Sequence, residues 1–366
     1  MKVLFVTNLP SPYRVDFFNE LGKQTELTVI YERKTASDRD AKWINEEERT
    51  FFEVYADLKQ VGTESSIGLG LFREIKKREF DVLIFGGYGS PSVMIAIALC
   101  RLKGIPFFIE SDGGFDKKDS FLKGIIKAFL LKKAKGHFIT CEQYRSYLLG
   151  KGIKEDVIYK YPFTSLKNTD IVEIIPSAEE KKMLREKFGL NGKYIVLAVG
   201  RFVDIKGFDV LLSSIKTLPG EYTACVVGGK PTEEYLSILG EDINRVTFVD
   251  FMDKESLKEY YRAADLFVMP TREDIWGLVV NEAMSNGLPV ISTDRCNAGL
   301  ELVENGVNGY IVPVDNVEIL TDTIRQAFDS GKIDEMAQNS LEKIREYTIE
   351  KMAERHMNIF REVTKI

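Results

Sequence analysis

The chain has 366 residues, of which 44% are hydrophobic and 29% are charged, and its formal net charge is −6. One hydrophobic core rarely fills so long a chain, so about two domains are expected. This composition is typical of a globular protein that folds in water, and it excludes disordered, fibrous and membrane-spanning classes. The negative charge argues against nucleic acid as a partner, because binding phosphates needs a basic surface.

Short β-branched and aromatic runs recur along the first half of the chain and alternate with helical patterns. Strands that alternate with helices indicate a mainly parallel sheet covered on both faces. The strands are expected at residues Lys2–Thr7, Leu27–Tyr31, Asp81–Phe85, Pro106–Glu110, His137–Thr140 and Val157–Tyr161, with helices at Val15–Gly22 and Ser92–Lys103.

The same alternation begins again in the second half, after a polar stretch from about Thr164 to Ser177. The sequence therefore predicts an α/β protein with two doubly wound, Rossmann-like domains that face a central cleft. The expected boundaries are 1–165 for the first domain, 166–189 for a linker that contains the helix Ala178–Phe188, and 190–347 for the second domain. A helix at about 348–366 is expected to pack back on the first domain. The strands of the second half are expected at Tyr194–Val199, Thr223–Val227, Val246–Val249, Leu266–Met269, Pro289–Thr293 and Gly309–Val312.

Two loops after strands of the second domain carry residues suited to a diphosphate. The strand Tyr194–Val199 leads into Gly200-Arg201, and Lys206-Gly207 opens the next helix. A glycine lets the backbone approach a ligand, and two cations can make charge-assisted hydrogen bonds to phosphate.

The second loop follows the strand Leu266–Met269 and carries Asp274 before a helix. The first N–H groups of that helix, around Gly277, Leu278 and Val279, form an anion site. Glu282 lies further along the helix, and a carboxylate accepts hydrogen bonds from a diol well.

These motifs, with Asn286-Gly287-Leu288-Pro289-Val290 after them, resemble the donor domain of family 4 glycosyltransferases, which have the GT-B fold. The resemblance covers about residues 190–330. It implies that Arg201 and Lys206 hold the donor diphosphate, that Glu282 holds the ribose and that Asp274 contacts the transferred sugar. It also implies a retaining transferase that uses a nucleotide-diphosphate sugar, with UDP as the expected nucleotide, in the assembly of bacterial surface polysaccharide.

One position departs from the family pattern. The family usually has Glu at the first acid, where this chain has Asp274, with Glu273 one place out of register. Asp274 keeps the spacing to Trp276-Gly277-Leu278 and is the predicted sugar contact, while Glu273 remains the alternative.

The acceptor is expected at the first domain, at the carboxyl ends of its strands. The candidate residues there are Tyr13, Arg14, Tyr88 and Asp112. Many family members have a histidine after the strand that ends here at Glu110, but this chain has only His137 and His356, and both are interpreted as structural. Asp112 is the nearest acid. It either orients the acceptor or takes its proton, or it serves only as a turn residue before Gly113-Gly114.

No metal site or cofactor is expected. The triplet Asp38-Arg39-Asp40 imitates a metal-binding DxD element but lies in a charged loop, and the four cysteines form no CxxC pair. No secretory or transmembrane segment is expected either, because the apolar runs are too short. These features predict a cytoplasmic enzyme.

Residues 117–135 form a basic amphipathic segment. It either binds an anionic membrane surface at the inner face of the cell membrane, next to a glycan or lipid-linked glycan acceptor, or buries its apolar face in the first domain. The alternatives for the whole protein are a GT-B nucleotide-sugar epimerase and a non-catalytic protein that binds nucleotides or sugars. A dehydrogenase is disfavoured because Gly86-Gly87-Tyr88-Gly89 lacks GxGxxG spacing.

Overall fold

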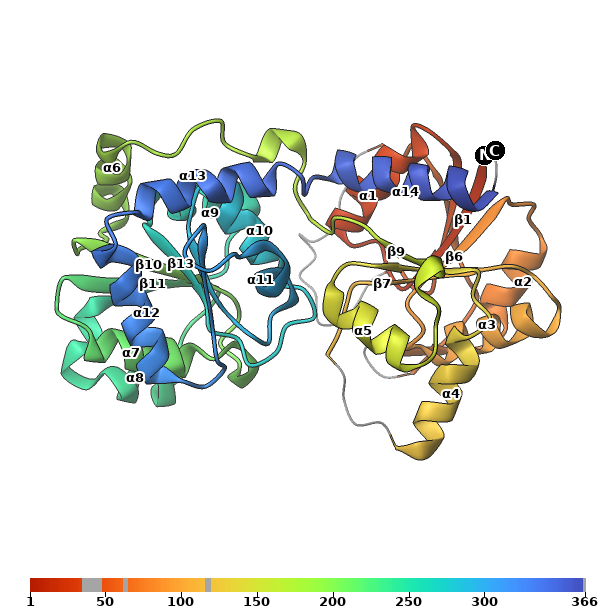
Figure 1. Ribbon diagram of the computed structural model, residues 1–366, viewed down its shortest axis with the longest axis horizontal. Coiled ribbons are helices and arrows are strands. Elements are labelled where there is room, and N and C mark those ends of the chain that lie inside the picture. The colour runs from red at the N-terminus through yellow and green to blue at the C-terminus, as the bar shows by residue number, and fades with distance from the viewer. Residues whose placement is uncertain (35–47, 62–64, 116–119, 365–366) are drawn as a thin grey trace. The chain divides into compact units, whose positions relative to one another are not determined.

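The computed structural model describes residues 1–34, 48–61, 65–115 and 120–364. The chain forms two compact units, of which unit 1 contains residues 1–165 and 348–366 and unit 2 contains residues 166–347 (Figure 1). Each unit is built on a parallel sheet with helices on both faces. The predicted α/β class with two Rossmann-like domains is confirmed.

Unit 1 has a seven-stranded parallel sheet in the order β3-β2-β1-β6-β7-β8-β9. The inner strands β1, β6 and β8 are nearly continuous buried runs, as expected where both faces of a parallel sheet are covered. The strands of this sheet are β1 (Lys2–Thr7), β2 (Glu26–Tyr31), β3 (Phe52–Tyr55), β6 (Val82–Gly86), β7 (Phe108–Ser111), β8 (Gly136–Ile139) and β9 (Ile158–Lys160), while β4 (Lys59–Val61) and β5 (Ser65–Ile67) form a separate two-stranded antiparallel sheet. The helices are α1 (Pro12–Gly22), α2 (Gly70–Lys76), α3 (Pro91–Leu102), α4 (Phe121–Leu131), α5 (Glu142–Gly150) and α14 (Ile349–Thr364).

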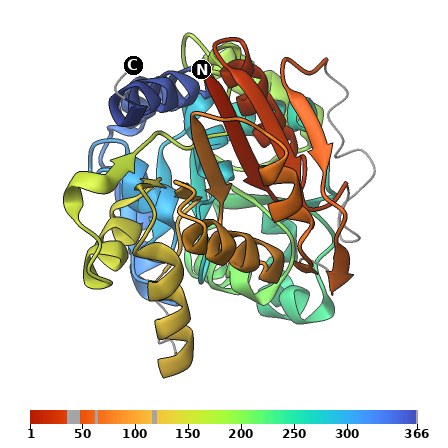
Figure 2. The same ribbon diagram turned by 90° about the vertical axis from the view of Figure 1, so that its right-hand side faces the viewer.

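The C-terminal helix α14 belongs to unit 1 although its residues come last in the chain. It lies beside α1 (Figure 1), and it buries a stripe that includes Ile349, Met352, His356 and Phe360. Seen from the side, α4 points away from the sheet (Figure 2).

Unit 2 has a six-stranded parallel sheet in the order β12-β11-β10-β13-β14-β15. This is the 3-2-1-4-5-6 order of the dinucleotide-binding fold. The strands are β10 (Tyr194–Val199), β11 (Tyr222–Val227), β12 (Val246–Val249), β13 (Leu266–Met269), β14 (Val290–Thr293) and β15 (Gly309–Val312). The helices are α6 (Ala178–Phe188), α7 (Phe208–Thr217), α8 (Glu233–Leu239), α9 (Lys254–Ala263), α10 (Leu278–Ser285), α11 (Asn297–Leu302), α12 (Val317–Asp329) and α13 (Ile333–Ile344).

The segment 166–189, predicted as a linker, lies within unit 2. Its helix α6 packs against the rest of the unit. Arg185 donates to Asp265 (Nη2–Oδ1 2.6 Å), and the ring of Phe188 stacks on that of Tyr260 with the ring centroids 4.1 Å apart. The low hydrophobicity of this segment suggested a linker. These contacts with residues far along the chain make it part of the fold.

A buried histidine in β8 makes the stability of unit 1 sensitive to acid. His137 is 1% exposed, and burial lowers its pKa to about 4. Since the unfolded chain takes up this proton near pH 6.5, we expect up to about 3 kcal/mol of stability to be lost as the pH falls from 6.5 to 4. His137→Gln should flatten the dependence of Tm on pH over this interval. Parallel slopes for the variant and the wild type would contradict the assignment.

Candidate functional site

The candidate donor residues meet at the switch point of the unit 2 sheet. The strand order reverses between β10 and β13, and ligands of open α/β sheets bind in the crevice at such a point, beyond the carboxyl ends of the strands. The loop after β10 carries Arg201 and Lys206, and the loop after β13 carries Asp274. The topology therefore brings together two motifs that are about 70 residues apart in sequence.

Gly207 allows the two loops to touch. Its φ is +66°, a conformation that favours glycine, and a Cβ atom there would lie 2.0 Å from the carbonyl oxygen of Pro270. The contact continues in two hydrogen bonds to the carbonyl of Ile205, one from the N–H of Arg272 and one from the hydroxyl of Thr271, each of 2.8 Å. As a result, Lys206 Nζ lies 2.6 Å from Asp274 Oδ2.

Arg272 secures the loop after β10 and was not identified from the sequence. Its guanidinium binds three carboxylates, those of Asp209 (2.6 Å), Asp315 (2.8 Å) and Asp204 (3.1 Å). Asp204 precedes Lys206 by two residues, so this cluster helps to hold Lys206 in place. Since these partners lie in two segments, residues 204–209 and the turn at Asp315, both far from Arg272 in sequence, no local motif marks it.

The two neighbouring acids of the second loop point to different partners. Asp274 pairs with Lys206, and its other carboxylate oxygen accepts a hydrogen bond from the N–H of Trp276 at 3.3 Å. Glu273 instead lies 3.4 Å from Arg295 Nη2. Asp274 is thus the acid beside the predicted phosphate ligand Lys206.

Helix α10 begins close to Asp274, and Gly277 is its N-cap residue. Gly277 has a φ of +100°, and a Cβ atom there would lie 2.7 Å from Cys296 Sγ. Helix geometry leaves the first N–H groups, those of Leu278 and Val279, without an acceptor inside the helix. This end of α10 can therefore receive an anion next to Lys206.

The remaining donor candidates lie at the same edge of the sheet. Glu282, one helical turn into α10, accepts a hydrogen bond from the buried hydroxyl of Tyr261 at 3.1 Å. Gly200 ends β10, and Arg201 after it is exposed. Within the described parts of the chain, the Arg201 side chain has no hydrogen bond or ion pair, so its guanidinium is available to a ligand.

In unit 1 the acceptor candidates gather around the end of β7. Arg14, which is 5% exposed, donates to Glu110 and to Asp112. Glu110 is fully buried, and although burial alone would raise its pKa, Arg14 and His356 lower the pKa of Glu110 to about 2. Burial raises the pKa of Asp112, against the opposing effect of Arg14. Of the three, Asp112 has the most exposed side chain, at 32%.

Tyr13 and Tyr88, the other acceptor candidates, are half-buried. The Tyr13 ring packs edge-on against Phe163 at 5.7 Å, and the hydroxyl of Tyr88 receives a hydrogen bond from that of Tyr144 at 3.2 Å. His137 lies in a core strand. His356, interpreted from the sequence as structural, contacts Glu110 at 3.0 Å and is thus connected to the acceptor candidates.

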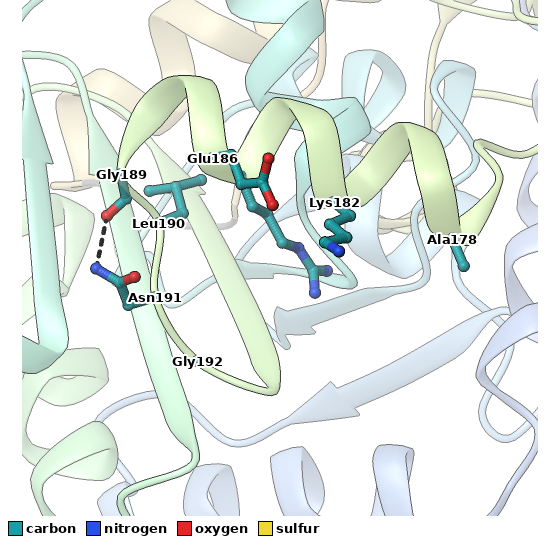
Figure 3. Close-up of a pocket in the computed structure, with 8 residues that line it drawn as sticks. Ala178, Lys182, Glu186, Gly189, Leu190, Asn191 and Gly192 are labelled. Atoms are coloured by element: carbon teal, nitrogen blue, oxygen red, sulfur yellow. Dashed lines mark hydrogen bonds between the residues drawn. The ribbon is translucent and has the colours of Figure 1, made fainter.

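The described residues contain no group of three His, Cys, Asp or Glu side chains that could hold a metal ion. The Asp38-Arg39-Asp40 triplet lies outside the described residues. A separate hollow lies between α6 and the turn before β10, lined by Lys182, Glu186 and Asn191 among others (Figure 3). It is at the amino end of β10, the opposite end from Gly200, so it is distinct from the candidate donor site.

Known proteins resemble this chain in sequence and in fold. Residues 180–350 match the family described as glycosyl transferases group 1. The chain is 35% identical to mannosylfructose-phosphate synthase of Agrobacterium fabrum over 31% of this chain and 28% of that protein. It is 31% identical to the lipopolysaccharide core biosynthesis glycosyltransferase LpsE of Rhizobium meliloti, over 36% and 38% of the two chains. The chain matches less than two thirds of the length of three curated relatives. In these three, mannosylfructose-phosphate synthase among them, the matched region makes up 28%, 48% and 61% of the relative's own length.

A solved structure shows the same fold over the whole chain. Anabaena Alr3699/HepE, in complex with UDP and glucose, superposes with a TM-score of 0.74 over 99% of this chain and 100% of that one, at 17% identity. The two Rossmann-like units therefore form a GT-B fold.

Proposed function

We propose that this protein transfers a sugar from a nucleotide-diphosphate sugar to a glycan or lipid-linked glycan, and the match of residues 180–350 to the glycosyl transferases group 1 supports this proposal. The observation that carries the proposal is the Lys206–Asp274 pair at the switch point, beside the start of α10 and the exposed Arg201. This arrangement offers cations and N–H groups for a diphosphate and a carboxylate for sugar hydroxyls.

In the proposed reaction, the bond between the anomeric carbon and the diphosphate oxygen breaks while the acceptor oxygen bonds to the same carbon. Arg201, Lys206 and the N–H groups at Gly277, Leu278 and Val279 stabilise the charge on the departing diphosphate. Asp274 contacts the sugar and Glu282 the ribose. The anomeric configuration is retained, and no metal takes part.

Asp112 is proposed to orient the acceptor hydroxyl and to receive its proton. Its raised pKa and partial exposure suit a base at the end of β7. Because Arg14 is buried against two carboxylates, its proposed role is to position Asp112, with Tyr13 and Tyr88 contacting the acceptor. Asp112→Asn with normal donor binding and normal turnover would remove Asp112 from the mechanism.

UDP is the proposed nucleotide, with support from the UDP and glucose bound by the Anabaena structure. The proposed role is in surface polysaccharide assembly, and the proposed location is the cytoplasm. The role is supported by the similarity to LpsE, which is named as a glycosyltransferase of lipopolysaccharide core biosynthesis. A thermal-shift panel of UDP-, GDP-, ADP- and dTDP-sugars should identify the donor, and NMR of the product should show retention. If the donor sugar is epimerised but not transferred, the protein is an epimerase. If it binds the nucleotide sugar without turning it over, it is a binding protein.

The two neighbouring acids provide a matched control. Asp274→Asn should lower sugar transfer, while Glu273→Gln should leave it nearly unchanged, because Glu273 is directed at Arg295. The reverse result would assign the sugar contact to Glu273.

We also propose that α4 docks unit 1 on an anionic membrane. Ile125, Ile126 and Phe129 on this helix are 51%, 50% and 40% exposed, so this part of its apolar surface faces solvent, while Leu130 and Leu131 at the end of the helix are buried in the unit. Lys123, Lys132, Lys133 and Lys135, at or just beyond the helix, are exposed as well. An exposed apolar stripe with basic neighbours fits the interface of a membrane that contains anionic lipid. Among the described helices, none is long and apolar enough to span a bilayer.

Charge reversal should test this docking surface. Lys132→Glu with Lys133→Glu is expected to weaken binding to vesicles containing phosphatidylglycerol at least tenfold, since each lysine near such a surface contributes ~1 kcal/mol. Lys59→Glu with Lys154→Glu, exposed lysines elsewhere in unit 1, is the charge-matched control. Equal flotation of both double variants would refute docking through α4.

A further inference from the structure

A chain of buried charges connects the C-terminal helix with Asp112. His356 of α14 is fully buried, and its Nε2 lies 3.0 Å from Glu110 Oε2. The other carboxylate oxygen of Glu110 accepts a hydrogen bond from Arg14 Nη1, and Nη2 of the same guanidinium donates to Asp112 Oδ1. The side chains of His356, Glu110 and Arg14 are 0%, 0% and 6% exposed, whereas that of Asp112 is 32% exposed. The chain of contacts therefore opens to solvent at the acid proposed to serve the acceptor.

Both ring nitrogens of His356 face acceptors. Nε2 faces the Glu110 carboxylate, and Nδ1 lies 2.8 Å from the carbonyl oxygen of Met352. Neither acceptor can donate a proton while Glu110 is ionised, so both contacts are hydrogen bonds only when the ring carries a proton on each nitrogen. Doubly protonated, the ring donates to both acceptors at once.

Aromatic rings hold the imidazole in this orientation. Phe138 stacks on it at 5.1 Å with an interplanar angle of 12°, and the rings of Tyr161, Phe17 and Phe360 lie at 4.6, 4.8 and 6.0 Å. The ring is therefore fixed by packing, and its hydrogen bond to Glu110 is directed.

The charges of this cluster balance. The titratable groups that surround it are Glu110 and Asp112 of the β7 end, Arg14 and Tyr13 of α1, Tyr31 of β2, Tyr161 after β9 and His356 of α14. Burial raises the pKa of the three tyrosines, which stay neutral. With the His356 ring doubly protonated, two cations and two carboxylates remain. If His356 were absent, Arg14 alone would face two carboxylates, and the less buried one, Asp112, would hold its proton more tightly.

We propose that His356 is a positioning residue for the acceptor side of the site: by neutralising Glu110 it leaves the charge of Arg14 free to orient Asp112 and to keep it ionised. The proposal rests on the role of Asp112 proposed above. Through His356, helix α14 would then help to set the proton affinity of Asp112, which lies 244 positions earlier in the chain.

The direct test follows the Asp112 carboxyl group by 13C NMR titration, with Asp112→Asn for assignment. His356→Phe keeps a ring in the aromatic pocket but removes both N–H groups, and it should raise the titration midpoint of Asp112 by about 0.5 to 1 pH unit. Ile359→Val, a change at another buried position of the same helix that leaves the His356–Glu110 hydrogen bond and the rings around it in place, is the control and should leave the midpoint unchanged. An unchanged midpoint in His356→Phe, or an equal change in the control, would overturn the proposal.

Two further readouts separate this proposal from the proposed function. The chain has only two histidines, so 15N NMR should resolve the His356 ring as doubly protonated at neutral pH, and a neutral ring would contradict the proposal. In transfer assays, the acid limb of the kcat/KM profile should move upward with the Asp112 midpoint, while donor KM is unchanged. If no sugar is transferred by the wild type, the proposed function fails, while the two NMR results still decide the role of His356. His356→Gln provides a second variant if His356→Phe does not fold.

Discussion

Replacing Lys206 with methionine should lower kcat for sugar transfer by about 10²- to 10³-fold. Removal of one preorganised donor from a site that stabilises developing charge typically costs this much. Lys206 lies in the loop after β10 at the switch point, where it is held by its 2.6 Å contact with Asp274 near the start of α10. Methionine keeps much of the length and volume of lysine, so the change isolates the charge.

The expected loss should fall on kcat more than on donor KM, because the diphosphate gains charge as the glycosidic bond breaks. Lys193→Met is the matched control, since Lys193 is exposed just before the amino end of β10, at the opposite edge of the sheet. Steady-state kinetics with the identified donor give the measurement. A Lys206→Met variant within threefold of the wild type would place the diphosphate elsewhere.

Replacing Arg14 with methionine should destabilise unit 1 by about 3–5 kcal/mol. This is the usual cost of removing one partner from a buried ion pair, because the other charge is left uncompensated. Arg14 is 5% exposed and its guanidinium serves both Glu110, which is fully buried, and Asp112. Methionine cannot donate to either carboxylate.

The pH dependence has a defined sign. The pKa of Glu110 is lowered to about 2 in the folded protein, so its contribution to stability is present above the unfolded pKa of about 4.3 and is lost as the pH falls toward 2. Arg14→Met should remove this acid-sensitive contribution together with the stability itself.

Hydrogen exchange read by mass spectrometry can assign the loss to unit 1. Protection should fall in β1 and β7 and remain in β10 and β13 of unit 2. Arg145→Met is the control, because Arg145 pairs with Glu142 and Glu155, which are more than half exposed, and such pairs contribute at most about 1 kcal/mol. Equal protection of β7 in the two variants would show that the Arg14 cluster does not stabilise the unit.

Much of the fold could be predicted from local patterns. The bounds of β10, β12, β13 and β15 were predicted without error. For the inner strands β10 and β13 the reason is that a strand buried on both faces reads as an apolar run between turn residues. β3 (Phe52–Tyr55) was missed, since none of its residues is buried and it carries no such run. Its place beside β2 is decided by backbone pairing.

The candidate donor residues were also readable from the sequence, because each motif is a short loop that follows a strand and opens a helix. The motifs could not show which of the two acids faces Lys206. In the tertiary structure Asp274, and not Glu273, pairs with Lys206, and Arg272 holds the loop after β10 in place. In unit 1 the tertiary structure brings Glu110 into contact with Arg14, 96 residues earlier in the chain, and with His356, 246 residues later. Local patterns record periodicity and turn chemistry, whereas the partner of a buried charge is set by which distant segments pack together.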